Sequence, residues 1–233
     1  MTYVISDIHG DLAGLRSVLE QIRLRPEDTL YVLGDVMDRL PDGVAILRWL
    51  MACPNCRMLL GNHELMMLNY LDEPSERNRW QWFRNGGEVT LKAFLALPEA
   101  ERRAITAFLR ARPLQAELRI GEWNYLLVHA APLRWYESYN YKNYDPTTFA
   151  VWYRLKGDEP LPEGTRLVFG HTPTPHDQPD QPPRVWRSGP FLGIDCGAAT
   201  ETGRLCCLRL EDGAAFYANQ DLSGCPRGLS PEN

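Results

Sequence analysis

Residues 2–39, which read TYVISDIHGDLAGLRSVLEQIRLRPEDTLYVLGDVMDR, decide the fold. The stretch opens with a short apolar, β-branched run at 2–6 and closes with a second run at 29–33, and each run predicts a strand. Between them, apolar side chains recur at helical spacing from residue 12 to residue 22. A strand, a helix and a strand in this order predict parallel strands joined by a right-handed crossover.

The same pattern continues along the chain. Apolar residues at helical spacing predict helices over residues 44–51 and 65–71, with a third strand at 58–60 between them. The chain is therefore an α/β protein that opens with a βαβαβ unit. A polar motif follows each of its three strands: Asp7-Ile8-His9-Gly10, Gly34-Asp35-Val36-Met37-Asp38-Arg39 and Gly61-Asn62-His63-Glu64. Because ligands collect at the carboxyl ends of strands in open α/β sheets, we expect these motifs to share one site.

The second half of the chain changes to short strands. Residues 78–113 are predicted to be helical and amphipathic, with a helix start at 98–101, and we interpret them as a solvated cap on the core. Six strands are then predicted, at residues 114–120, 123–128, 166–169, 191–194, 204–210 and 214–217. Two loops, 136–146 and 173–183, each follow a motif histidine, so each either borders a substrate cleft or is an ordered surface loop.

Length and charge narrow the class of protein. A chain of 233 residues fits one domain, which we predict over residues 1–222, with a disordered tail over 223–233. The net charge of −5 and the absence of a Lys/Arg-rich run disfavour nucleic acid as the main partner. No signal peptide precedes the first strand and no apolar stretch approaches the roughly 20 residues of a membrane span, so we expect a cytoplasmic protein with no membrane partner.

The cysteines do not predict a second site. Cys53 and Cys56 have C-x-x-C spacing, but a four-cysteine zinc site needs another such pair, and Cys206-Cys207 is not one. A redox pair is expected to open a helix after a strand, whereas this pair lies between a helix and a strand. We interpret it as a turn.

The polar motifs together predict a pair of metal ions. His129 and the sequence Gly170-His171-Thr172 complete a set of carboxylate, imidazole and amide groups, which are ligands for divalent cations. Two such cations roughly 3.5–4 Å apart are suited to in-line displacement at phosphorus. Asp7 and His9 are two residues apart on an extended segment and so share one face. The set predicts a hydrolase of phosphate esters.

The motifs resemble the signature of the calcineurin-like metallophosphoesterase superfamily. More narrowly, they resemble the PPP-type serine/threonine protein phosphatases, and the compact phage and bacterial members are the most similar. Further similar stretches extend the resemblance from Met1 to about Leu210: Trp82, Asn85-Gly86-Gly87, Val151-Trp152-x-Arg154, Gly170-His171-Thr172-Pro173 and Ile194-Asp195-x-Gly197-Ala198. The resemblance implies a four-layer sandwich in which two mixed β-sheets are flanked by helices.

The resemblance also implies roles for single residues. The first ion would be held by Asp7, His9 and Asp35. The second ion would be held by Asp35, Asn62, His129 and His171. His63 would be the general acid, oriented by Asp38, and Arg39 and Arg154 would bind the phosphate. Manganese is the expected metal, with iron or zinc as alternatives, and a hydroxide bridging the two metals would attack phosphorus in line.

Elementary chemistry agrees with the implied roles to different degrees. Imidazole titrates nearest neutrality, which suits His63 as a proton donor to a leaving alkoxide. The planar fork of Arg39 suits phosphate oxygens. Arg154 rests on a weaker motif, and a structural salt bridge is its alternative role. Asp195 either orients a ligand histidine or caps a turn.

Two positions depart from the family pattern. Leu40 stands where a glycine usually follows the arginine, so the loop is expected to be stiffer and to displace Arg39. Ala130-Ala131 stands where the family has a glycine pair after His129. This change is expected to affect substrate access more than metal binding.

The expected function is a metal-dependent phosphoprotein phosphatase whose substrate is a phosphorylated protein or a small phosphoester, with no prediction of oligomeric state. The alternative is a symmetrical diadenosine tetraphosphate hydrolase of the same superfamily. That group typically lacks the aspartate matching Asp38 and has aspartate in place of Glu64, so both residues favour the phosphatase. A second alternative is a non-enzymatic metal-binding scaffold, which the full set of motif residues disfavours.

Overall fold

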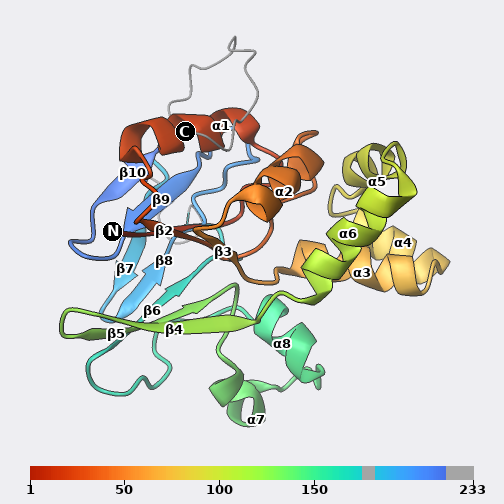
Figure 1. The fold of residues 1–233 in the computed structure, drawn as a ribbon. Coiled ribbons are helices and arrows are strands. Elements are labelled where there is room, and N and C mark those ends of the chain that lie inside the picture. Colours follow the sequence, from red (N-terminus) through yellow and green to blue (C-terminus); the bar gives the residue numbers. More distant parts are fainter. Residues whose placement is uncertain (175–181, 219–233) are drawn as a thin grey trace.

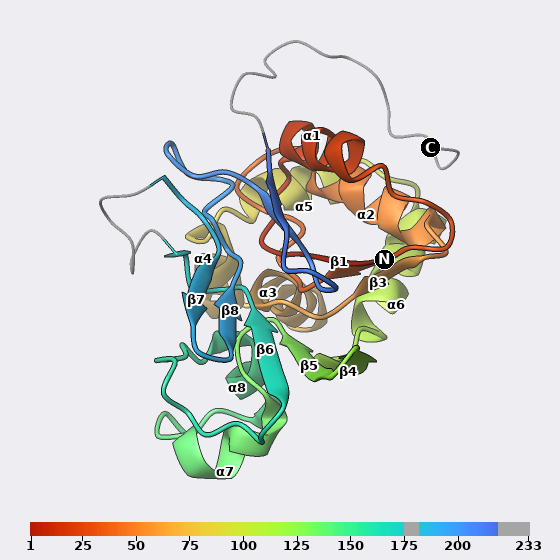
Figure 2. The ribbon, with the colours of Figure 1, turned by 90° about the vertical axis from the view of Figure 1, so that its left-hand side faces the viewer.

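The computed structural model describes residues 1–174 and 182–218. The predicted tail at 223–233, and His176 within the predicted loop at 173–183, lie outside the described residues. Two five-stranded sheets pack face to face, with helices on their outer faces (Figures 1 and 2). The α/β sandwich of two mixed sheets is therefore confirmed.

The first sheet contains the opening βαβαβ unit. Its strands lie in the order β10-β9-β1-β2-β3, and β1, β2 and β3 are parallel, as predicted. The bounds are β1 Thr2–Ile5, β2 Thr29–Val32, β3 Cys56–Met58, β9 Cys206–Arg209 and β10 Ala215–Tyr217. The unit's crossovers and the helix after it are α1 Leu12–Ile22, α2 Gly43–Ala52 and α3 Asn62–Asp72. Strands β9 and β10 add an antiparallel edge from the far end of the chain.

The second sheet has the order β4-β5-β6-β8-β7, with β5, β6 and β8 parallel and both edge strands antiparallel. The bounds are β4 Gln115–Ile120, β5 Trp123–Val128, β6 Thr165–Phe169, β7 Trp186–Ser188 and β8 Phe191–Gly193. Strand β7 was not predicted. It is a three-residue edge strand with no fully buried residue, so it has no apolar alternation to recognise.

Side-chain alternation along the strands separates three apolar cores. In β1, Tyr3 and Ile5 face the core under the helices, whereas Val4 faces the core between the sheets. In β5, Leu127 joins the core between the sheets, and Leu126 and Val128 join the core under the helices of the other face. These three cores make the four layers of helix, sheet, sheet and helix.

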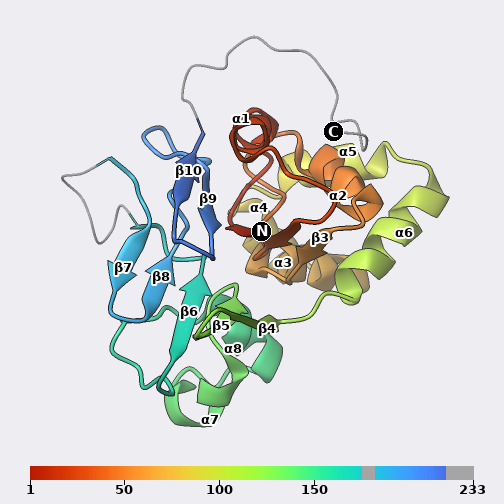
Figure 3. The ribbon, with the colours of Figure 1, turned by 60° about the vertical axis from the view of Figure 1, so that its left-hand side comes forward.

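The central helical region was predicted correctly in type but not in detail. It forms three helices, α4 Glu76–Phe83, α5 Glu88–Leu95 and α6 Glu99–Arg110, beside the first sheet (Figure 1). The predicted loop 136–146 is partly helical, because it contains α7 Tyr136–Tyr139 and the start of α8 Pro146–Trp152. A short 3-10 helix, Leu133–Trp135, precedes α7. Helix α8 begins where Asp145 accepts a hydrogen bond from the Thr148 backbone N–H and proline takes the first turn. Helices α7 and α8 lie against the outer face of the second sheet (Figure 3).

Two further expectations concern the Cys53–Cys56 pair and the membrane. The Cys53–Cys56 segment is a turn between α2 and β3, as interpreted, and both thiols are free. Within residues 1–174 and 182–218, no helix combines the length and the apolar composition that crossing a membrane requires.

Candidate metal centre

The predicted site residues lie at the carboxyl ends of parallel strands from both sheets. Asp7 and His9 follow β1, Asp35 follows β2 and Asn62 follows β3. His129 follows β5 and His171 follows β6. All six are buried. Backbone hydrogen bonds join the loops, from His9 N to Asp35 O at 2.9 Å and from Gly170 N to His129 O at 2.9 Å.

The backbone around the site is strained. In the described part of the chain, eight non-glycine residues have a positive φ, and six of the eight are predicted site residues. These six are Asp7, His9, Asp35, Asp38, Arg39 and His171. Such conformations cost free energy and persist only where the surrounding structure enforces them, and they concentrate at functional sites. The sequence did not predict this strain, and the extended segment expected at Asp7 and His9 is wrong, because both residues have a positive φ.

Two glycines allow the loops after β2 and β3 to meet. A Cβ atom on Gly34 would lie 2.6 Å from the Cα of Gly61, and a Cβ on Gly61 would lie 2.3 Å from Oδ1 of Asp35. Because any side chain would separate the loops, these glycines set the distance between the Asp35 and Asn62 side chains.

Asp35 lies between two groups of candidate ligands. Its Oδ2 atom is 3.8 Å from Nε2 of His9 and 3.8 Å from Nε2 of His63. Its Oδ1 atom faces the other way, 3.6 Å from Nε2 of His129. His9, Asp35 and His63 form the first group, and the predicted ligand Asp7 lies beside it, with Oδ1 4.0 Å from Nε2 of His9. The two oxygens of one carboxylate thus serve two groups.

The second group converges on the Asn62 amide oxygen. This oxygen lies 2.8 Å from Nε2 of His129 and 2.9 Å from Nδ1 of His171. His129 donates its Nδ1–H to the Leu33 carbonyl at 2.8 Å, and His9 donates its Nδ1–H to the Met37 carbonyl at 3.1 Å. Both rings therefore turn Nε2, with its lone pair, toward the centre.

This donor set fits cations. Burial lowers the pKa of His9, His129 and His171, which favours neutral rings with one free lone pair each. The lone pair of His129 then faces the lone pairs of the Asn62 oxygen at 2.8 Å. Burial, with the charges of Asp7 and Glu64, raises the pKa of Asp35. A divalent cation relieves both conflicts, and mixed oxygen and nitrogen donors suit manganese, iron or zinc.

His63, which turns Nε2 toward the first group, also forms a buried pair with Asp38. Nδ1 of His63 lies 2.7 Å from Oδ2 of Asp38, and the Trp82 indole N–H donates to the same oxygen at 2.8 Å. The Asp38 backbone N–H donates to the Thr90 hydroxyl at 2.9 Å. Burial raises the pKa of Asp38 to about 7 and lowers the pKa of His63. Desolvation by burial is the larger cause of both shifts.

The two predicted phosphate ligands are exposed. Arg39 is held through its backbone N–H, which donates to the Gly86 carbonyl at 3.1 Å, and its charge lowers the pKa of His63 after the larger effect of burial. The Leu40 N–H donates to the His9 carbonyl at 3.1 Å, which joins this loop to the loop after β1. Arg154 donates from Nη1 to the His171 carbonyl at 3.2 Å. The structural salt bridge considered for Arg154 is absent among the described residues.

Sequence reasoning assigned no supporting role to three residues that support the site. Glu64 is fully buried, and its carboxylate accepts hydrogen bonds from the backbone N–H groups of Asp35, Val36 and Gly61 at 2.8, 2.9 and 3.0 Å. A glutamate three residues after a helix cap was a usable signal. Trp82 and Thr90 support Asp38 from α4 and α5, so the helical cap also buttresses the site. Trp82 was noted only as part of the family resemblance, without a role, and no pattern marked Thr90.

Asp195 has the second of its two expected roles. Its side chain accepts a hydrogen bond from the Gly197 N–H at 2.9 Å and so caps a turn. Its carbonyl accepts from the Thr174 N–H at 2.8 Å.

The chain belongs to the calcineurin-like phosphoesterase family. The family model with that description matches residues 2–195, which is most of the chain. This membership confirms the broader part of the resemblance and identifies a hydrolase of the metallophosphoesterase superfamily. Family membership agrees with a binuclear centre for divalent metals, for which the structure supplies the two ligand groups around Asp35.

Two relatives from different bacteria share one name. A protein of Paracidovorax citrulli named "Bis(5'-nucleosyl)-tetraphosphatase, symmetrical" is 32% identical over 180 residues, which cover 73% of this chain and 57% of that protein. A protein of Erwinia tasmaniensis with the same name is 46% identical over 69 residues, covering 29% of this chain and 25% of that protein. The chain thus spans at most somewhat more than half the length of these relatives. The narrower resemblance to PPP-type phosphatases is not reflected in their names.

Solved structures share the fold at low sequence identity. A putative diadenosine tetraphosphatase matches with a TM-score of 0.64 at 18% identity, covering 93% of this chain and 92% of the other. A cold-active protein-tyrosine phosphatase of a Shewanella species matches with a TM-score of 0.58 at 17% identity, covering 94% and 80%. These likenesses support the architecture alone.

Proposed function

We propose that this chain hydrolyses dinucleoside tetraphosphates symmetrically, in a metal-dependent reaction that gives two nucleoside diphosphates. The observation that carries hydrolysis is the Asp35 carboxylate, which turns one oxygen to each of two ligand groups. The name shared by the relatives supports the choice of substrate. The expected phosphoprotein phosphatase thereby becomes the second candidate.

The proposed ligands follow the two groups. Asp7, His9 and Asp35 would hold one ion. Asp35, Asn62, His129 and His171 would hold the other. When bound, the two cations would supply positive charge and Lewis acidity at the phosphorus that reacts. We propose manganese as the metal, with iron or zinc as alternatives that elemental analysis of the untreated protein distinguishes.

The chain's own residues would bind and orient the phosphate chain. Arg39 and Arg154 are exposed cations near the buried ligands, Arg39 beside His9 and His63 and Arg154 beside His171. A guanidinium pairs with two phosphate oxygens at once. During the reaction a water oxygen bonds to phosphorus and the bridging P–O bond breaks. The electron pair of that bond leaves with the second nucleoside diphosphate, and the protons of the water are released to the products and solvent.

The His63–Asp38 pair favours the second candidate. A serine or threonine alkoxide is a strong base and requires a proton as it leaves, which a positioned imidazole supplies. A nucleoside diphosphate is a much weaker base and leaves without one. The 2.7 Å contact from His63 to Asp38 therefore supports cleavage of phosphomonoesters, including phosphorylated proteins. A non-enzymatic scaffold has no need of such a pair.

A substrate comparison tests the proposal. Manganese-loaded protein is incubated with diadenosine tetraphosphate, a phosphoserine peptide and a phosphotyrosine peptide, and kcat/KM is measured for each by chromatography of the products. We expect the dinucleotide to be the best substrate, with ADP as the sole nucleotide product, and Asp35→Asn to abolish the reaction. A higher kcat/KM for a phosphopeptide would replace the proposal with the second candidate, and inactivity on all three would support the scaffold.

A further inference from the structure

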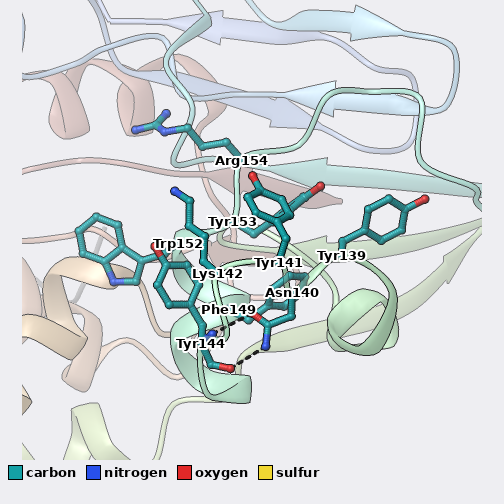
Figure 4. A pocket seen from close by; sticks show the side chains of 9 residues that line it. All are labelled: Tyr139, Asn140, Tyr141, Lys142, Tyr144, Phe149, Trp152, Tyr153 and Arg154. Carbon is teal, nitrogen blue, oxygen red and sulfur yellow. Dashed lines mark hydrogen bonds between the residues drawn. The ribbon is translucent and has the colours of Figure 1, made fainter.

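An aromatic cavity of about 380 Å³ lies beside the metal centre. Six aromatic side chains line it, together with Asn140 and the cations Lys142 and Arg154 (Figure 4). The six are Tyr139, Tyr141, Tyr144, Phe149, Trp152 and Tyr153. The roles assigned above use only Arg154 from this set. A cavity of this size falls within the range of small-molecule sites, and its lining combines aromatic rings with hydroxyl, amide and cationic groups.

The cavity wall is held in place by its own hydrogen bonds. Asn140 accepts from the Tyr144 backbone N–H at 2.9 Å and donates to the Tyr144 carbonyl at 2.7 Å. The Tyr136 hydroxyl donates to that carbonyl at 2.9 Å. The segment between these residues is therefore a braced loop, and it presents Tyr141 and Lys142 at its tip.

The rings offer stacking surface that the fold does not use. Phe149 and Tyr153 pack together with ring centroids 5.0 Å apart and form the base of the aromatic wall. Tyr141 contacts Tyr153 edge-on at 6.1 Å, yet 68% of Tyr141 remains exposed. An exposed aromatic ring at the edge of an aromatic cavity is a ready platform for a planar ligand.

The cavity adjoins the proposed ligand His171. The Trp152 ring contacts the His171 ring edge-on, with centroids 5.8 Å apart, and Arg154 donates to the His171 carbonyl at 3.2 Å. In Figure 4, the Lys142 amine and the Arg154 guanidinium lie toward one side of the view, and Tyr139 lies on the opposite side. A ligand there would have its ring among the tyrosines and its anionic end toward the metal centre.

We propose that this cavity binds the nucleoside of a nucleoside polyphosphate. The base would stack on Tyr141, and Lys142 and Arg154 would pair with the phosphates that lead to the centre. This inference rests on the proposed function and names the part of the chain that selects a nucleotide. The charges of Lys142 and Arg154 are complementary to a chain of several phosphates. Lys142 has no acidic partner among the described residues, and its amine lies 5.9 Å from the Tyr144 ring.

The test is equilibrium binding without catalysis. Calorimetric titrations in EDTA measure the Kd of the full chain for ADP, pyrophosphate and phosphotyrosine. We expect ADP to bind more tightly than both other probes. Tyr141→Ala is expected to weaken ADP binding about tenfold, which corresponds to one lost base-stacking contact, and to leave pyrophosphate binding unchanged. Lys142→Ala is expected to weaken both.

The matched control variants replace an exposed aromatic residue and a lysine that both lie outside the cavity. Trp80→Ala on α4 and Lys92→Ala on α5 should leave all three Kd values unchanged. An unaltered ADP affinity in Tyr141→Ala, or tighter binding of phosphotyrosine than of ADP, would overturn the inference. If ADP binding behaves as expected but the dinucleotide is not cleaved, the proposed function fails and the binding site stands. If the dinucleotide is cleaved but Tyr141→Ala leaves the Kd for ADP unchanged, the proposed function stands and the binding site fails.

Discussion

At the residue scale, single carboxylates organise the centre. Asp35 reaches both ligand groups with its two oxygens, and Glu64 holds the backbone of Asp35 in place. The motif residues were predictable because carboxylate, imidazole and amide side chains can be recognised as metal ligands from the sequence alone. The supporting roles of Glu64, Trp82 and Thr90 were not predicted, because these residues act through backbone or side-chain partners that only the folded chain brings near.

Replacing Glu64 by glutamine tests this support. The NH₂ of the glutamine amide would face a backbone N–H that now donates a hydrogen bond to the carboxylate. An NH₂ group cannot accept that bond, so one buried donor loses its partner. We expect the free energy of unfolding to fall by roughly 1–3 kcal/mol, and the manganese content to fall with it. Urea denaturation and elemental analysis measure both, with Glu20→Gln on the exposed face of α1 as the control. Unchanged stability and metal content in Glu64→Gln would show that the carboxylate is not needed to hold the Asp35 backbone in place.

Replacing Asp38 by asparagine tests the role of the His63 pair. The change removes the carboxylate that orients the ring, so protonation of a poor leaving group suffers most. We expect kcat for a phosphoserine peptide to fall by about 100-fold, and kcat for diadenosine tetraphosphate to fall far less. Steady-state kinetics on both substrates measures the difference. Equal losses on the two substrates would mean that the pair has a structural role only.

At the element scale, the centre is built where five parallel strands end. The βαβαβ unit was predictable because its strands and helices have clear apolar periods. Strand β7 and helix α7 were not, because three or four residues are too few to show a period. The contact between the loops after β2 and β3 was also not predictable, since it depends on how closely two strands approach.

Alanine at Gly61 tests that contact. Its Cβ would lie 2.3 Å from Oδ1 and 2.4 Å from the backbone N of Asp35, so the two loops must move apart. We expect a loss of roughly 1–3 kcal/mol in the free energy of unfolding, and weaker manganese binding, measured by denaturation and by titration. Gly121→Ala is the control, because its Cβ would meet nothing within 4 Å although its φ of +58° is unfavourable for alanine. Metal binding as weak in Gly121→Ala as in Gly61→Ala would contradict the explanation.

At the scale of the whole molecule, the centre joins the two sheets. Asp7, Asp35 and Asn62 follow strands of the first sheet, whereas His129 and His171 follow strands of the second. Periodicity predicts the elements but not which strands pair across more than 100 residues, and the sandwich followed from the family resemblance. The same resemblance favoured a phosphoprotein substrate, from which the relatives' shared name now points away.

Metal binding should therefore stabilise the whole fold. Manganese at 100 times its Kd is expected to add about 2.7 kcal/mol, which raises Tm by roughly 5–10 °C for a chain of this size. Thermal denaturation with manganese and with EDTA measures the shift. In Asp35→Asn, which lacks the shared carboxylate, the shift should vanish. A manganese-dependent rise in Tm that survives Asp35→Asn would place the binding elsewhere.

The most direct test of the account is an anomalous-difference map from crystals soaked in manganese. The account predicts two peaks that share the Asp35 carboxylate, one beside Asp7 and His9 and the other beside Asn62, His129 and His171. A map with no peak at Asp35, or with manganese bound only elsewhere, would contradict it.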